Sequence, residues 1–234
     1  DAGGAISVDL QSMADGSATD ALDIDSNTID FADSASAAAG IDVDVDAGST
    51  DTNAITISSN DVNATGNSNN MVGIQLANDN AFDAGTTTDI SDGTLDGVST
   101  GILEGGNGLG DFLNVTSVTM EDIDQNTPRG IDLTGSPGAT ITVDDLTVDS
   151  SPNANAIYLD DSSDLTVTGS SINDTDVGVQ VDSANNNVIV SGTSIDNTGT
   201  HAIDINNPGA DVTVNESSSI DQGATGIEVT GGSG

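Results

Sequence analysis

The sequence has no cysteine, no tryptophan and no lysine, and aromatic residues make up only 2% of its 234 positions. The absence of cysteine excludes disulfide bonds, so bonding gives no indication of the redox compartment. No apolar run approaches the ~18 residues that a membrane-spanning helix needs. No basic segment followed by an apolar segment opens the chain, so we expect any secretion signal to have been removed or to lie outside this segment. Any core must be built from Ile, Val, Leu and Ala.

Basic side chains are also nearly missing. A single arginine, Arg129, stands against 39 Asp and Glu residues, and the formal net charge is −38. Nucleic acid is therefore not an expected partner, because both molecules would be polyanions. Only four of the acids are Glu, and Asp favours turns and strand ends over helices. High charge with few aromatics can indicate disorder, but a disordered chain has no reason to keep its apolar residues in a regular alternation.

That alternation is organised as a repeat. A Gly/Ala-Ile-x-Val-like segment recurs nine times, at intervals of 35, 33, 28, 29, 26, 22, 24 and 24 residues. The nine segments are Ala5–Val8, Gly40–Val43, Gly73–Leu76, Gly101–Glu104, Gly130–Leu133, Ala156–Leu159, Gly178–Val181, Ala202–Ile205 and Gly226–Val229. Periods of 20–50 residues are typical of solenoids. Apolar spacing of two, with Gly, Asn or Asp every few residues, favours strands over helices.

Each repeat contains two further short strands. The second is expected at segments such as Ile55–Ile57 and Ile141–Val143, and near Asp89–Ser91 in the least regular coil, 73–100. The third is expected at segments such as Thr94–Asp96, Asp122–Asp124 and Thr147–Asp149. We therefore predict an all-β fold, a parallel β-helix (β-solenoid) of about nine coils of three short strands. It forms a single domain over 1–234, with longer-looped coils over 1–130 and regular coils of 22–26 residues over 130–234, or else a segment of a longer solenoid. With ~4.8 Å between coils, the rod would be about 40 Å long.

The residues Gly178–Val181 followed by Val188–Ile195 resemble the right-handed parallel β-helix repeats of the pectate-lyase-like superfamily. The resemblance extends from about Ala5 to Val229. It implies a right-handed helix but leaves function open, because members include pectin-acting lyases and hydrolases, surface adhesins and phage tailspikes.

An enzymatic interpretation of that resemblance has weak support. Hydrolases of the superfamily use clustered Asp residues after a strand, and Asp160 and Asp161 follow Ala156–Leu159. Paired carboxylates ~6.5–9.5 Å apart can divide acid and base roles at a glycosidic bond. The lyases use a cationic base, for which Arg129 is the only candidate, although one arginine among so many carboxylates is more typical of a structural ion pair. The only histidine, His201, is not flanked by glycines as in the family pattern.

Carboxylates also suggest Ca²⁺, whose ligands are carboxylate and carbonyl oxygens. The candidate ligands are the acids that cluster in strands and turns: Asp42, Asp44, Asp46, Asp122, Asp124, Asp144, Asp145, Asp160 and Asp161. No EF-hand loop or Gly-Gly-x-Gly-x-Asp nonapeptide is present, so specific sites and diffuse counterions are both open. A charge density near one per ångström of rod exceeds that of duplex DNA, at one per ~1.7 Å. We therefore expect a cation atmosphere and a marine or high-salt environment.

Two further expectations concern the outward-facing side chains and the two ends of the repeat array. On the first strands the outward row is Asp42, Gln75, Leu103, Asp132, Tyr158, Gln180, Asp204 and Glu228. Outward threonines on the second strands leave an ice-binding face open, although Asp23, Asn114 and Ile189 interrupt that row. Neither end shows a capping element, which favours stacking of copies or continuation of the solenoid.

We therefore predict a non-catalytic structural or adhesive module of an extracellular filament or cell-surface protein. It would self-associate end to end and be stabilised by cations, with a polysaccharide or a cell surface as a further candidate partner. The alternative is a polysaccharide-acting (pectinase-like) enzyme or glycan-binding module on the same fold.

Overall fold

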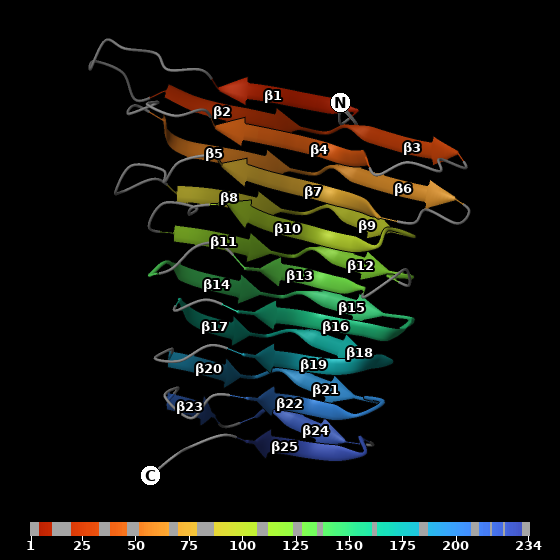
Figure 1. Ribbon diagram of the computed structural model, residues 1–234, viewed down its shortest axis with the longest axis vertical. Helices are drawn as coiled ribbons and strands as arrows, with labels where there is room; N and C mark the ends of the chain where they lie inside the picture. Colours follow the sequence, from red (N-terminus) through yellow and green to blue (C-terminus); the bar gives the residue numbers. More distant parts are fainter. Residues whose placement is uncertain are drawn as a thin grey trace.

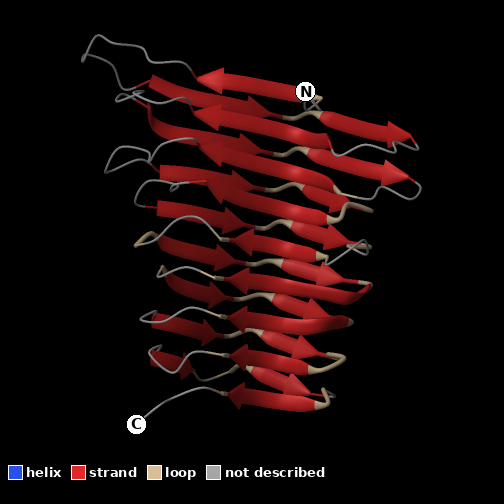
Figure 2. Cartoon of the chain, viewed as in Figure 1, coloured by secondary structure: helices blue, strands red, loops and turns tan. Residues whose placement is uncertain are grey.

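The computed structural model describes residues 5–10, 20–32, 38–45, 52–65, 70–78, 87–106, 112–123, 128–134, 138–160, 163–182, 187–206, 211–215, 217–221 and 223–230. These residues form three parallel β-sheets and contain no helix (Figures 1 and 2). The chain passes through the three sheets in turn, so each coil adds one strand to each sheet. In Figure 1 the coils stack from the N-terminal strand at the top to the C-terminal strand at the bottom.

The three sheets take every third strand, and we name them A, B and C in chain order. Sheet A contains β1 (Ile6–Leu10), β4 (Ala38–Val45), β7 (Met71–Asn78), β10 (Thr100–Gly106), β13 (Arg129–Leu133), β16 (Ser151–Leu159), β19 (Thr175–Val181), β22 (His201–Ile205) and β25 (Thr225–Val229). Sheet B contains β2 (Asp20–Asp25), β5 (Thr52–Ser58), β8 (Thr87–Ser91), β11 (Phe112–Thr116), β14 (Thr140–Asp144), β17 (Asp164–Thr168), β20 (Asn187–Ser191) and β23 (Asp211–Val214). Sheet C contains β3 (Thr28–Ala32), β6 (Asp61–Thr65), β9 (Thr94–Asp96), β12 (Thr119–Glu121), β15 (Thr147–Asp149), β18 (Ser171–Asn173), β21 (Ser194–Asp196) and β24 (Ser219–Asp221).

The predicted repeat fixes the register of the coils. All nine Gly/Ala-Ile-x-Val segments lie in sheet A, and their second residues pair in one unbroken ladder from Ile6 to Ile227. The residues on either side of each x point inward and stack on the same position of the next coil. The resulting core is almost wholly Ile, Val, Leu, Met and Ala, so each coil covers the apolar face of its neighbour.

Close packing explains the small first residue of the motif. A Cβ on Gly101 would lie 2.6 Å from the carbonyl oxygen of Gly130 and 2.8 Å from Sδ of Met120. Sheet A therefore approaches sheet C too closely for a larger side chain at this position. Only Gly or Ala is found there.

The turn between sheets B and C recurs from β2–β3 to β20–β21. Its first residue has a positive φ in each of these seven coils, as Ser59 (55°) and Asp145 (53°) illustrate. Its second residue points into the core, and Asn60 there donates Nδ2 to the carbonyl oxygens of Ile24 and Ser58 at 2.8 and 2.9 Å. Polar atoms buried at this corner are thus satisfied by backbone groups of the same and the preceding coil.

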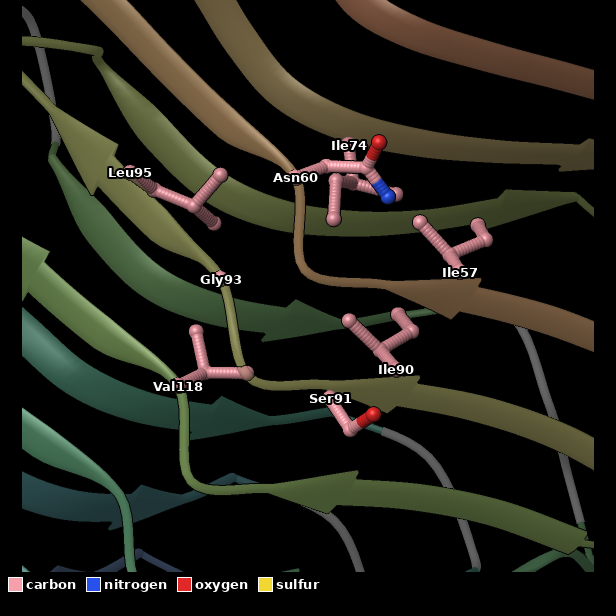
Figure 3. A pocket seen from close by; sticks show the side chains of 8 residues that line it. All are labelled: Ile57, Asn60, Ile74, Ile90, Ser91, Gly93, Leu95 and Val118. Atoms are coloured by element: carbon pink, nitrogen blue, oxygen red, sulfur yellow. The ribbon is translucent and has the colours of Figure 1, made fainter. Parts of the chain in front are cut away.

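Gly93 occupies the inward turn position one coil after Asn60 and lines a narrow void without room for a water molecule. Figure 3 shows this void, which is lined by Ile57, Asn60, Ile74, Ile90, Ser91, Gly93, Leu95 and Val118. A Cβ on Gly93 would lie 2.5 Å from the carbonyl oxygen of Asn60. Glycine is therefore required here by the neighbouring backbone.

One predicted strand is wrong and one difficult strand is confirmed. The third strand of the fourth coil is β12, in which Met120 pairs with Leu95 and Val148, and not Asp122–Asp124. Asp122 has a φ of 52°, which ends the strand, and Ile123 is a buried turn residue. In coil 73–100, β8 forms at the expected place, with Thr88 in the inward position that Leu or Ile fills in its neighbours.

Candidate functional site

The chain's single arginine lies at the centre of a polar cluster on the outer face of sheet A. Nη1 of Arg129 donates to both carboxylate oxygens of Asp132, at 2.8 and 2.7 Å. The guanidinium carbon lies 3.5 Å from the centroid of the Tyr158 ring, a cation–π contact. Burial raises the pKa of Asp132, the hydrogen bond and charge of Arg129 oppose that shift, and the nearby Asp160 carboxylate adds to it. Arg129 is therefore fully engaged as a structural ion-pair partner.

A second polar group adjoins this cluster along the axis. Asp182 accepts hydrogen bonds from the Tyr158 hydroxyl at 3.0 Å, from Gln180 Nε2 and from Asn206 Nδ2 at 2.6 Å. Burial, the hydrogen bond to Asp182 and its charge raise the pKa of Tyr158 to about 12. These bonds connect three successive coils, so the network stabilises the stack.

The only histidine also connects coils. Nε2 of His201 on β22 lies 2.8 Å from Oε2 of Glu228 on β25. This contact is an ion pair only when the imidazole is protonated.

The proposed Ca²⁺ ligands lie on different strands and turns. Asp42 and Asp44 point outward from β4, and Asp122 is in the turn after β12. Asp144 ends β14, Asp145 is the first residue of the turn that follows, and Asp160 follows β16. Asp144 accepts from Thr168 at 2.6 Å and Asp145 from Ser117 at 3.0 Å, so both join neighbouring coils. Asp46, Asp124 and Asp161 lie outside the described residues. Within the described ranges, no three His, Cys, Asp or Glu residues are grouped so that they could hold a metal ion.

Asp42 has an unusual environment. Burial raises the pKa of Asp42, and its Oδ1 is buried without a hydrogen-bond partner among the described residues. Its neighbours in the outward row are Ser7 and Gln75, so no like charge is stacked directly against it.

Sheet C carries the most regular acidic face. Its outward row reads Asp30, Asn63, Asp96, Glu121, Asp149, Asn173, Asp196 and Asp221. Amides relieve part of the repulsion, since Asn63 donates to Asp30 at 3.0 Å and Asn173 to Asp149 at 2.7 Å. Three acids remain directly stacked around Glu121, and the pKa of Asp96 is raised by burial and by Asp122.

Sheet B has a shallow trough of about 310 Å³ on its outer face, across β14, β17, β20 and β23. Its lining is Thr140, Asp164, Thr166, Asn187, Ile189, Asp211 and Thr213. Ile189 is one of the few large apolar side chains exposed on the described surface. This trough brings together two features that the sequence left unconnected, the outward threonines and the interrupting Ile189, with two acids at strand starts, Asp164 and Asp211.

Comparison with known proteins is consistent with this architecture. The chain matches the family model described as a right handed beta helix region over residues 72–234, and it belongs to that family. The coils are therefore right-handed, and the similarity to the pectate-lyase-like superfamily agrees with the match. No curated protein and no solved structure matches the chain. No described segment is a helix long and apolar enough to cross a membrane.

Sequence reasoning missed the Asp182 network although a signal for it exists. The residue directly after each first-strand motif is polar and in register in four successive coils: Asp160, Asp182, Asn206 and Thr230. Thr230 Oγ1 donates to Asn206 at 2.9 Å. Aligning that one extra column would have predicted a polar ladder, although not the tyrosine that bonds to it.

Proposed function

We propose that the chain is a non-catalytic structural or adhesive module of an extracellular filament or cell-surface protein, associating end to end with further copies and stabilised by cations. The supporting observation is an apolar surface on the last described coil. Ile227 is 46% exposed and Val229 59%. The corresponding inward residues in the middle of the rod are almost fully buried, so no coil among the described residues covers this surface.

The first strand of another copy has the right pattern to cover it. If β1 of a second copy adds to the free edge of β25, the sheet A ladders continue as Ile227 on Ile6 and Val229 on Val8. The outward Glu228 then stacks on the uncharged Ser7, and no acid–acid contact forms in that row. Among the described residues sheets B and C each contain one strand fewer than sheet A, so the contact proposed here is formed by sheet A. This head-to-tail contact does not close, and it therefore builds a filament.

Cations are part of this proposal because the modules are highly negative and repel one another. Like charges stacked ~4.8 Å apart repel by about 0.9 kcal/mol even in bulk water. Modules of net charge −38 therefore repel one another strongly unless counterions screen them. Ca²⁺ bound by the strand and turn acids is the candidate ion, and the same requirement supports a marine or high-salt setting.

Sedimentation velocity and electron microscopy test this proposal with and without Ca²⁺. We expect filaments whose length falls on addition of chelator or substitution of Ile227→Asp with Val229→Asp. Phe112→Asp is the control, because it places one Asp on an exposed apolar site in the middle of the rod, against the two that the double variant adds at its end. A chain that stays monomeric at high Ca²⁺, or filaments that tolerate the Ile227/Val229 variant, would refute the proposal.

The polysaccharide-acting alternative has one observation in its favour. Asp132 has a raised pKa and lies near Asp160, as an acid–base pair requires. Arg129, however, is bound to Asp132 and stacked on Tyr158, so it is not available as a base. A reducing-sugar or unsaturated-uronate assay on acidic glycans, repeated with Asp160→Asn and Asp161→Asn, decides this: turnover abolished by these variants would favour the enzyme.

A further inference from the structure

The trough on sheet B has two chemically different sides. One side is a polar row in which Asp164, Asn187 and Asp211 occupy the first position of successive strands. The other is a row of Thr166, Ile189 and Thr213 two residues further along the same strands. Ile189 is 36% exposed, so the floor offers methyl groups to a ligand that lies along the axis.

The polar row presents two carboxylates at a fixed separation. Asp164 and Asp211 are two strands apart, or about 9.6 Å along the axis. Asn187 lies between them and donates both its backbone N and Nδ2 to Oδ1 of Asp164, at 2.9 and 3.0 Å. Asp211 is exposed, and its carboxylate has no hydrogen-bond or ion-pair partner among the described residues.

The separation of the Asp164 and Asp211 carboxylates restricts which ligands could contact both. A single Ca²⁺ ion cannot bridge two carboxylates about 9.6 Å apart, because Ca²⁺–oxygen distances are ~2.3–2.6 Å. An anion is opposed by the charge of the whole chain. An elongated ligand with a cationic group at each end and an apolar middle meets both carboxylates and the Ile189 floor at once.

We propose that this trough binds a linear aliphatic diamine or polyamine, with its ammonium groups at Asp164 and Asp211 and its methylene chain over Ile189. Ammonium–carboxylate hydrogen bonds are charge-assisted and stronger than neutral ones. The methylene groups pack against Ile189 and the methyls of Thr166 and Thr213. This inference is separate from the proposed end-to-end association, because the trough lies on the outer face of sheet B whereas that contact would form along sheet A.

The test compares two dications that differ in reach. Hexamethylenediamine spans the two carboxylates and ethylenediamine does not, and slightly acidic buffer keeps both amines of each protonated. Titration calorimetry at physiological ionic strength measures the affinity, and methyl NMR of Ile189 shows whether the diamine binds in the trough. We expect hexamethylenediamine to bind at least ~10-fold more tightly, the factor that one charge-assisted hydrogen bond supplies, and to shift the Ile189 methyl signals.

Variants separate the trough from general charge attraction. Asp211→Asn should weaken hexamethylenediamine binding by about 10-fold, and Ile189→Thr should weaken it while leaving the net charge unchanged. Asp23→Asn is the matched control, since it removes one charge from the outer face of the same sheet in the first coil, and should change affinity less than ~2-fold because of screening. Equal affinity of the two diamines, equal effects of Asp211→Asn and Asp23→Asn, or unmoved Ile189 signals would overturn the proposal.

Discussion

Replacing Arg129 with methionine should destabilise the protein in a pH-dependent way. The substitution keeps an apolar stem but removes the guanidinium that donates to both oxygens of Asp132. Asp132 is largely buried, and it would then carry its charge without a partner. The contact between the guanidinium and the Tyr158 ring would be lost at the same time.

The expected loss follows from the exposure of the pair. Breaking a fully buried ion pair costs about 3–5 kcal/mol, but the Arg129 and Asp132 side chains keep 22% and 13% of their surface exposed. We therefore expect ~2–3 kcal/mol for the pair and ~0.5–1 kcal/mol for the cation–π contact. For a chain of this length the sum corresponds to a Tm lower by about 5–16 °C.

The pH dependence of the stability loss tests whether the unpaired Asp132 carboxylate causes it. Burial already raises the pKa of Asp132, so its neutral form is favoured by folding, and that contribution is present at low pH and lost as pH rises through the folded pKa. Loss of Arg129 raises this pKa further. The difference between Arg129→Met and wild type, measured by urea denaturation, should be largest at neutral pH and shrink as Asp132 becomes protonated.

A double variant tests whether the unpaired Asp132 charge is what destabilises the Arg129→Met protein. Arg129→Met combined with Asp132→Leu removes the orphaned charge, and the preceding coil carries Leu103 at the same position. The double variant should recover most of the lost stability at neutral pH. A single variant as stable as wild type, or one whose defect grows at low pH, would refute the explanation.

Three further predictions concern single positions. Glu121→Gln, within the stacked acids of sheet C, should stabilise the chain by about 0.5–1 kcal/mol at low salt and much less in concentrated NaCl, as read from thermal melts. Gly93→Ala should lower the free energy of unfolding by ~1–3 kcal/mol, because its Cβ meets the Asn60 carbonyl; an unchanged urea midpoint would contradict this. Tyr158, the chain's only tyrosine, should titrate at about 12 by ultraviolet absorbance, and removing its hydrogen-bond acceptor with Asp182→Asn should bring that midpoint down; a normal value in the wild type would contradict the contact.

The fold could be predicted because inward positions are constrained in every coil. Each Ile-x-Val segment must place two apolar residues on the same positions of its neighbours, so nine imperfect copies still specify one register. The error at Asp122–Asp124 has a local cause. The segment alternates like a strand, but a positive φ at Asp122 ends it, and side-chain pattern alone does not report backbone dihedrals.

The outward surface was harder to predict. Which outward side chains meet depends on rotamers and on exact register between coils, and Arg129 could have paired with any of several acids. The trough on sheet B was less visible still, because Asp164, Ile189 and Asp211 lie far apart in sequence; only Ile189 stood out, as an interruption of a threonine row, and the two acids were not singled out.

Disulfide cross-linking tests the stacking of the coils most directly, because the chain has no cysteine of its own. Gln75 and Leu103 are register partners on adjacent strands of sheet A, at a Cα separation of ~4.8 Å that permits a disulfide. Gln75→Cys with Leu103→Cys should oxidise rapidly to an intramolecular bond in the folded protein. Gln75→Cys with Asp132→Cys, about 9.6 Å apart across two coils, should not. Equal oxidation of the two pairs, or no bond in the first, would contradict the parallel stack on which everything else depends.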